Sequence, residues 1–140
     1  MYKSSKIIER PGKTVIPLKI GGNEAHIIDR GKGTRYIGFV DGDKKDGFGI
    51  LTNDNGNVYY GEFLNDKMNG MGRIQFSNGD TYKGYFVNNQ KNGLGEYRIF
   101  SSGTVYKGGF FGNLIIGNGV VTTSDGKTYN VLHGEKISAN

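Results

Sequence analysis

The chain has 140 residues, a length that fits one domain, and only 35% of them are hydrophobic. It contains no cysteine, which excludes disulfides and thiolate metal sites. Its formal net charge is +5, and no apolar run reaches the 18 or so residues that a membrane-spanning helix needs. Glycine is the outlier with 25 residues, and because its spacing is periodic we interpret it as a structural residue.

The first 35 residues carry the whole net charge. They hold eight Lys or Arg residues and three acids, whereas the rest of the chain is neutral. Two interpretations of this basic arm are open. It is either a solvated segment that aids solubility, or a docking arm for an acidic protein tail, an anionic lipid surface or a nucleic acid. The candidate docking residues are Lys3, Lys6, Arg10, Lys13 and Lys19.

The arm also holds the start of the folded region. Residues 14–20 are predicted to form a strand, and the Gly-Gly-Asn that follows them predicts a turn. Pro17 has no backbone N–H, which indicates that this strand lies at an edge of the sheet. Residues 26–35 look like the second half of a repeat, with His26 where the first repeat glycine would be. Residues 1–35 are therefore predicted to be a basic arm with an edge hairpin and a half-repeat cap.

A Tyr-x-Gly unit then recurs four times, at intervals of about 23 residues. Each Tyr is followed by a Gly-x-Gly and, further on, by a closing Gly. A fixed period in this range is typical of a stacked array of structural units, and such arrays usually bind rather than catalyse. The four units are residues 36–58, 59–81, 82–105 and 106–128.

Each unit is predicted to be one β-hairpin. In the third, two alternating segments flank a polar turn at residues 88–93. Stacked hairpins give an all-β fold, an elongated, curved, single-layer antiparallel sheet. The curvature is inferred from the columns of glycine, because glycine inside strands marks bulges or close backbone approach. The third unit has one residue more than the others, which predicts a bulge near residues 97–100.

The tyrosines and the aromatic residues four positions after them share one face of this sheet. One interpretation is a small hydrophobic core. The other is a groove that accepts a helix or an extended segment of a partner protein. Both can hold, with inner rings buried and rims accessible. The candidate partner-binding residues on this face are Tyr59, Phe63, Tyr82, Phe86, Tyr97, Tyr106 and Phe110.

The turn of the fourth unit is apolar, whereas the first three are polar. Exposed apolar clusters usually mark contacts, so we expect an interface with a partner or with a second copy of the chain. Packing against a C-terminal cap is the alternative. Residues 129–140 begin a fifth unit and are predicted to be a cap strand and a tail. The apolar residues of the turn are Phe111, Leu114, Ile115 and Ile116.

The sequence shows no constellation of catalytic or metal-ligating residues. His26 and His133 lie at opposite ends of the array, and the carboxylates do not pair within a unit. One turn superficially resembles a calcium loop, but Lys45, Asp46 and Thr52 stand where that loop needs Asp or Asn, Gly and Glu. We therefore expect no enzymatic activity, no metal and no cofactor. Nucleic acid is disfavoured as a partner because the repeat region is electrically neutral.

The unit that starts at Tyr82, with Gly84, Gly93 and Gly95 at fixed intervals, resembles the MORN repeat. Four copies cover residues 36–128, with Val or Phe in place of the family's Trp. The resemblance implies an elongated, curved single-layer β-sheet. It also implies a scaffold, since MORN proteins are parts of cilia and flagella such as radial spokes, of the cortical cytoskeleton and of membrane junctions. Some have been assigned phosphoinositide binding.

Residues and resemblance together predict a non-enzymatic scaffold of a cytoskeletal assembly inside the cell, first of all a ciliary or axonemal one of the radial-spoke kind. The expected partners are other proteins of a large assembly. An acidic protein tail or anionic lipid at the basic arm, and a homodimer, are further candidates. The alternative is a peripheral membrane module that binds anionic lipids or phosphoinositides. Lys83 and Lys107 share one sheet face in its favour, and Glu62 and Asp41 interrupt that surface.

Overall fold

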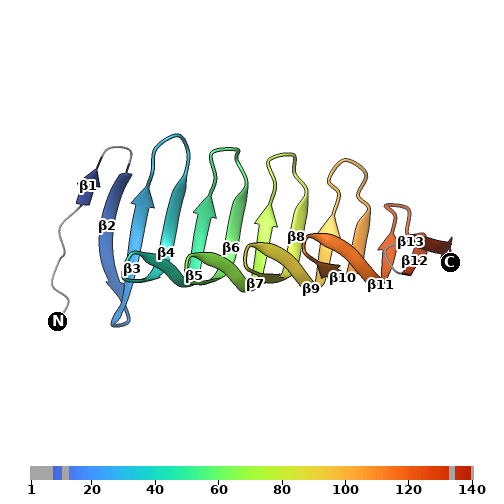
Figure 1. Ribbon diagram of the computed structural model, residues 1–140. Helices are drawn as coiled ribbons and strands as arrows, with labels where there is room; N and C mark the ends of the chain where they lie inside the picture. Colours follow the sequence, from blue (N-terminus) through green and yellow to red (C-terminus); the bar gives the residue numbers. More distant parts are fainter. Residues whose placement is uncertain (1–7, 11–12, 133–134, 140) are drawn as a thin grey trace.

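The computed structural model describes residues 8–10, 13–132 and 135–139, and the side chains of residues 13–132. The described chain forms one antiparallel sheet of 13 strands, each paired with its neighbours in the sequence (Figure 1). No helix in this part of the chain is long and apolar enough to cross a membrane. The strands are β1 (Ile8–Arg10), β2 (Lys13–Ile20), β3 (Asn23–Asp29), β4 (Arg35–Asp41), β5 (Lys44–Thr52), β6 (Val58–Leu64), β7 (Lys67–Gln75), β8 (Thr81–Val87), β9 (Gln90–Arg98), β10 (Val105–Phe111), β11 (Leu114–Thr122), β12 (Thr128–Leu132) and β13 (Glu135–Ala139).

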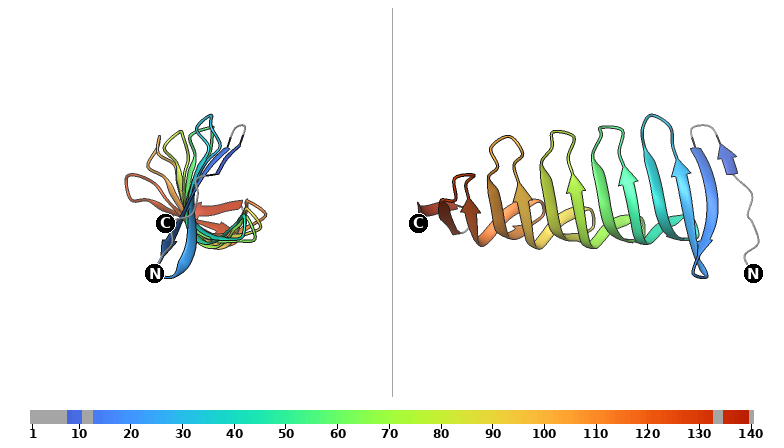
Figure 2. Two further views of the ribbon diagram at one scale, coloured as in Figure 1. Left: turned by 90° about the vertical axis from the view of Figure 1, so that its left-hand side faces the viewer. Right: turned by 180° about the vertical axis from the view of Figure 1, so that it is seen from behind.

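The sheet is elongated, open and one layer thick, which confirms the predicted array of consecutive hairpins. Viewed along its length, the strands of the array bend, so that two rows of turns point in different directions (Figure 2). One row holds the tight turns inside the units, and the other holds the longer turns between units. The bend gives the sheet an inner corner that a flat sheet would not have.

Pairs of glycines face each other across the strands of every unit. In the third unit Gly84 lies opposite Gly95. A Cβ atom on Gly95 would lie 2.6 Å from Cζ of Tyr82, and one on Gly84 would lie 2.6 Å from the Cα atom of Gly95. Only glycine leaves room for the tyrosine ring, so the glycine columns are required by the position of the rings. The equivalent pairs are Gly38 with Gly49, Gly61 with Gly72 and Gly108 with Gly119.

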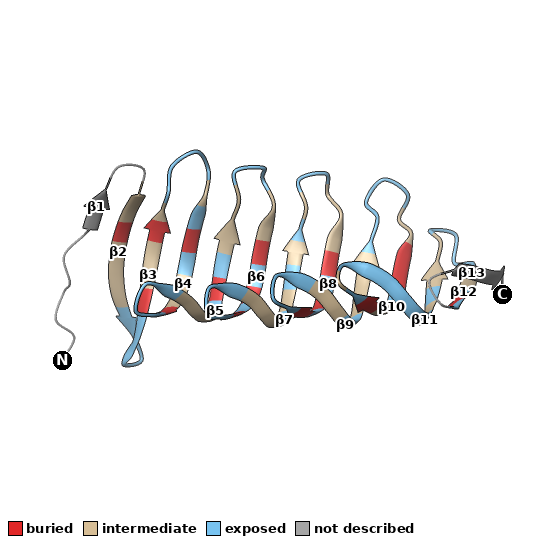
Figure 3. Cartoon of the chain, in the orientation of Figure 1, coloured by how far each residue is buried: buried red, intermediate tan, exposed pale blue. Residues whose placement is uncertain are grey.

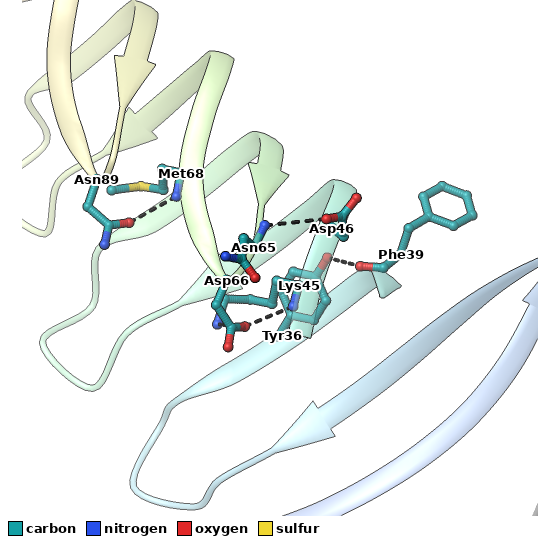
Figure 4. Close-up of polar contacts among 8 residues, drawn as sticks. All are labelled: Tyr36, Phe39, Lys45, Asp46, Asn65, Asp66, Met68 and Asn89. Atoms are coloured by element: carbon teal, nitrogen blue, oxygen red, sulfur yellow. Dashed lines mark hydrogen bonds and ion pairs between the residues drawn. The ribbon is translucent and has the colours of Figure 1, made fainter. Parts of the chain in front are cut away.

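Each unit also has a bulge directly after the first glycine of this pair, as between Gly84 and Phe86. The tyrosine hydroxyl holds the bulge, because it donates a hydrogen bond to the carbonyl oxygen three residues further on. Tyr82 donates to Tyr85 at 3.0 Å. The same bond joins Tyr36 to Phe39 (2.6 Å, Figure 4), Tyr59 to Glu62 (2.7 Å) and Tyr106 to Gly109 (3.1 Å).

The centre of the core is a zigzag of seven aromatic rings that runs along the sheet, and the buried Val15, Ile28, Val40 and Val131 extend it. Successive rings meet edge to face, with centroids 5.0 to 5.4 Å apart, a favoured geometry for aromatic pairs. The buried positions recur along the strands (Figure 3). We call this side of the sheet the ring face and the other side the outer face. In order along the zigzag the rings are Tyr36, Phe63, Tyr59, Phe86, Tyr82, Phe110 and Tyr106.

The prediction of a bulge near residues 97–100 is wrong. From Gly95 to Arg98, β9 pairs without a break with both of its neighbours. The extra residue lies in the following turn, where the N–H of Ile99 donates to the carbonyl of Thr104 and the N–H of Gly103 donates to the carbonyl of Ile99. A turn accepts an added residue without loss of ladder hydrogen bonds, whereas a bulge in β9 would disturb two neighbouring strands.

At the N-terminal end, β2 pairs with β3 over residues 14–20 and with β1 over residues 13–15. The prediction that this strand lies at an edge of the sheet is wrong, because β1 lies outside it. Pro17 lies opposite His26 of β3, beyond the residues that β1 pairs with. His26 lies opposite Gly38, as Gly49 lies opposite Gly61 in the next unit. His26 thus stands at the second glycine position of the Gly-x-Gly rather than at the first.

Burial of the tyrosines makes the stability of the fold depend on alkaline pH. Burial raises the pKa of Tyr82 and of Tyr97 to about 12, and it raises the pKa of Tyr36 and Tyr59 further. Tyrosine in the unfolded chain ionises near pH 10, so above about pH 10 the unfolded state loses protons that the folded state keeps. The contribution of these tyrosines to the free energy of unfolding is therefore fully present below about pH 10, and it is lost as the pH rises toward their folded-state pKa values.

We expect the melting temperature to be equal at about pH 7 and pH 9 and to fall steadily above about pH 10. The tyrosinate absorbance is followed at the same time. Part of its rise in the folded protein should occur at a higher pH than in the urea-unfolded chain. Titration curves that coincide for the folded and unfolded chains would contradict this prediction.

Candidate interaction surfaces

The ring-face residues predicted to bind a partner form the core of the array. Tyr82 and Phe86 have exposed fractions of 0% and 1%. Tyr97 is half-buried, and its hydroxyl donates to a carboxylate oxygen of Asp80 at 2.9 Å. The rings hold neighbouring units together, and a partner on this face would meet the polar rim around them. The other predicted residues that are buried here are Tyr59, Phe63, Tyr106 and Phe110.

A hollow of about 210 Å³ lies beside the rings between the first and second units. Lys45 lines it, with its ammonium nitrogen 5.8 Å from the ring centroids of Tyr36 and Phe63. The ammonium also forms an ion pair with Asp66 at 3.2 Å. The charge of Lys45 is therefore compensated inside the protein, and this hollow has no free cation.

Lys91 occupies the same position in the third unit, and its environment differs. Its ammonium nitrogen lies 5.7 Å from the ring centroid of Tyr82 and 5.9 Å from that of Phe76. The turn residue that corresponds to Asp66 is the neutral Asn113, and burial lowers the pKa of Lys91. In residues 13–132, no carboxylate lies within ion-pair distance of Lys91.

A repeated polar contact joins each hairpin turn to the unit before it. The N–H of Asn89 donates to the carbonyl of Met68 at 3.0 Å, and the side-chain oxygen of Asn89 accepts the N–H of Met68 at 2.9 Å (Figure 4). Asp66 makes the same two bonds to Lys45, at 2.9 and 2.8 Å. Asn113 makes them to Lys91, at 3.0 and 2.9 Å. We call this pair of bonds the turn clamp.

The turn clamp yields a test with a matched control. Replacing Asn89 by Gly keeps a residue that accepts its positive φ of 71° but removes the acceptor for the N–H of Met68. We expect a loss of about 1 kcal/mol in the free energy of unfolding, measured by urea denaturation. The Asn88→Gly variant is the control, because Asn88 also has a positive φ but its side chain makes none of these bonds. Equal losses in both variants would show that the clamp contributes nothing.

The outer face carries large exposed apolar side chains that the sequence analysis did not single out. Phe48 and Leu94 have exposed fractions of 61% and 68%. The middle residue of each Gly-x-Gly lies at this position, so strand alternation could have found it. Seven exposed apolar residues of β4 to β9 on this face form what we call the outer apolar patch, and Leu64 and Val87 are exposed beside the hairpin turns. The patch residues are Ile37, Phe48, Ile50, Tyr60, Met71, Tyr85 and Leu94.

The apolar turn of the fourth unit is exposed. Phe111 and Leu114 have exposed fractions of 63% and 69%, and Ile115 and Ile116 are also exposed. β12 pairs with β11 only from Gly119 onward. The C-terminal strands therefore leave these side chains uncovered among the described residues.

The basic residues predicted to contact a partner lie, where their side chains are described, on β2 and on the outer face. Lys13 and Lys19 are six residues apart on β2, about 20 Å along an extended strand, so they do not form one cluster. On the outer face the register places Arg73, Lys83 and Lys107 in one row, and Glu96 between the two lysines pairs with Lys107 at 3.5 Å. Of the other predicted arm residues, Lys3 and Lys6 lie outside the described residues, and Arg10 is described only as a backbone position in β1.

Within the described part of the chain, no group of three or more His, Cys, Asp or Glu side chains could hold a metal ion. The two faces of the sheet differ in what they offer. The ring face is filled by its own rings, and the outer face and the fourth turn present apolar side chains to solvent.

Comparison with known proteins agrees with this fold. The MORN repeat family model matches residues 36–58, 59–81, 82–104 and 106–128, and no curated protein matches the chain. MORN repeats are in general protein-interaction or membrane-binding modules, and MORN-repeat proteins are generally non-enzymatic. Four consecutive matches that each coincide with one hairpin of the sheet show that the chain belongs to the MORN-repeat family.

Proposed function

We propose that the chain is a rigid, non-enzymatic scaffold module that binds other proteins of a large assembly through its outer face. The outer apolar patch carries this proposal. In the described residues the core cluster lies on the ring face, so the patch on the other side stays exposed. Large apolar side chains gathered on an exposed face usually mark an interaction site. The ring zigzag and the turn clamps keep that surface in a fixed shape.

The proposed setting is a cytoskeletal assembly inside the cell, with the ciliary axoneme and its radial spokes as the first candidate. It is supported by the family's use of such arrays as scaffold parts. An extended sheet whose strands lie about 4.8 Å apart suits a spacer between proteins, because its length is fixed by the number of strands.

An alternative is supported by the row of Arg73, Lys83 and Lys107 on the outer face. Basic residues beside exposed aromatic and aliphatic side chains suit an anionic membrane surface. Glu96 lies within this row and pairs with Lys107, which lowers its positive charge. The basic row therefore supports membrane binding less strongly than the outer apolar patch supports binding to a protein.

Affinity purification from the native cells tests the proposal with two matched variants. Leu94→Asp places a charge in the outer apolar patch. Asn55→Asp places the same charge in the exposed turn between β5 and β6, outside the patch, and keeps the side-chain oxygen that accepts the N–H of Asn57. We expect the unmodified chain and Asn55→Asp to retain the same stoichiometric set of proteins and Leu94→Asp to lose it. A set that Leu94→Asp retains in full would contradict binding through this patch.

Vesicle binding separates the two functions. Purified protein is sedimented with vesicles that contain phosphatidylserine or phosphoinositide, at about 0.15 M and about 0.5 M salt. The scaffold proposal predicts no binding that depends on Arg73, Lys83 and Lys107. Binding that is lost in the triple Ala variant, combined with an empty affinity purification, would replace the scaffold by the membrane module.

A further inference from the structure

The first half of β11 is a free sheet edge. β11 pairs with β12 over residues 119–122, and among the described residues no strand pairs with residues 114–118 on that side. The equivalent halves of β5, β7 and β9 are each covered by the turn of the next unit.

The chain itself shows what such an edge binds. In each of the three turn clamps, the second residue of a two-residue turn is Asp or Asn, and it bonds the strand of the unit before it through its N–H and its side-chain oxygen. The turn residues have positive φ, which Asn and Asp tolerate best after glycine. The clamp residues are Asp66, Asn89 and Asn113.

Ile115 is the fourth receptor of this kind. It pairs with Phe110, as Lys91 pairs with Phe86 in the third unit. The N–H and the C=O of Lys91 point away from its hairpin partner toward Asn113, so the same groups of Ile115 point to the open side of β11. No described residue clamps them.

The side chains around this receptor differ from those around the other three. Leu114 and Ile116 flank Ile115 and are exposed, whereas Gln90 and Asn92 flank Lys91. An apolar free edge is a liability in a protein that works alone, and natural sheets usually block such edges with charge. The partner of this edge therefore has apolar residues next to its turn.

We propose that residues 114–118 bind a β-turn of a different protein, one that carries Asp or Asn at its second turn position and apolar residues beside it. This rests on the proposed function, and it names the chemistry of one contact. The described part of a second copy does not offer such a turn. Its three Asp- or Asn-bearing turns of this geometry are already engaged. Of its other two-residue turns, the one at Gly21 and Gly22 has no Asp or Asn, and in the one after β4 Gly42 has a positive φ of 64° but Asp43 does not.

The test uses the full chain and a defined probe. The probe is a hairpin peptide with the sequence of residues 107–118 and its Gly-Asn turn, closed by a disulfide between one cysteine added at each end. A second peptide has Asn113→Gly. Backbone amide NMR should show a shift and slower hydrogen exchange at Ile115 with the Asn peptide. The affinity should be about fivefold higher than for the Gly peptide, as the loss of one hydrogen bond predicts.

Variants of the chain check the location. Ile115→Pro removes the N–H of the receptor and should abolish peptide binding, whereas Ile115→Val keeps the N–H and should bind as the unmodified chain does. The comparison of the two peptides needs no variant, so it remains decisive if Ile115→Pro unfolds. Equal affinity of both peptides, or no shift at Ile115 with about 1 mM peptide, would overturn the proposal.

Analytical sedimentation of the chain alone tests whether a second copy of the chain occupies this edge. A dimer that dissociates in Ile115→Pro would assign this edge to a second copy and would also overturn the proposal. These outcomes are separate from the affinity purification, which reads the outer apolar patch through Leu94. Peptide binding with no captured partner would contradict only the patch, and captured partners without peptide binding would contradict only the edge.

Discussion

Replacing Phe86 by Ala is expected to lower the free energy of unfolding by about 3 to 5 kcal/mol. The Phe86 ring is 1% exposed and lies edge to face between Tyr59 and Tyr82, at centroid distances of 5.2 and 5.1 Å. The variant removes this ring from the middle of the zigzag, so the second and third units lose the aromatic contact that joins them. Urea denaturation followed by tyrosine fluorescence measures the loss.

Phe111→Ala is the matched control for that variant. Phe111 is the same residue type on the next hairpin, but 63% of it is exposed. Its replacement is expected to change the free energy of unfolding by less than about 0.5 kcal/mol. A loss of similar size in both variants would mean that the ring zigzag is not the main source of cohesion.

Replacing Gly95 by Ala is expected to lower the free energy of unfolding by about 3 kcal/mol, although only one methyl group is added. The backbone of Gly95 does not have a positive φ, so the cost is steric. The new Cβ atom would lie 2.6 Å from Cζ of Tyr82. The ring must move away, and the hydrogen bond from Tyr82 to Tyr85 and the contacts with Phe86 and Phe110 are then weakened.

A double-mutant cycle with Tyr82→Ala isolates this clash. Without the ring, the methyl group of Ala at position 95 has space, so Gly95→Ala should cost less than about 1 kcal/mol in that background. Strictly additive losses would show that the glycine is needed for another reason, such as close approach of the two strands at Gly84.

The sequence was sufficient to predict the array of hairpins, because each residue that recurs with the period has a definite structural role. Tyr82 and Gly95 recur together, since the ring needs the missing side chain. Which ring-face residues are buried in the core and which remain accessible was not predictable in the same way. Alternation puts Tyr82 and Tyr97 on one face, but only the packing of neighbouring units decides that Tyr82 is fully buried and Tyr97 is half-buried.

The contacts between units were the part that the sequence analysis missed. Asp66, Asn89 and Asn113 stand at the same position of successive units, and a turn preference explains them without reference to another unit. That their side chains also bond the preceding strand depends on how far each hairpin is displaced along its neighbour. The extra residue of the third unit was misplaced for a similar reason, because the sequence does not show whether a strand or a turn accepts it.

The pairing of each strand with only its sequence neighbours has a consequence for how such proteins change over time. A copied unit would meet, on both sides, the same surfaces that its original meets. Gene duplication can therefore lengthen the protein in steps of two strands, about 9.6 Å each, without redesign of any existing contact. The distance between whatever is bound at the two ends then becomes an inherited quantity that varies in discrete increments.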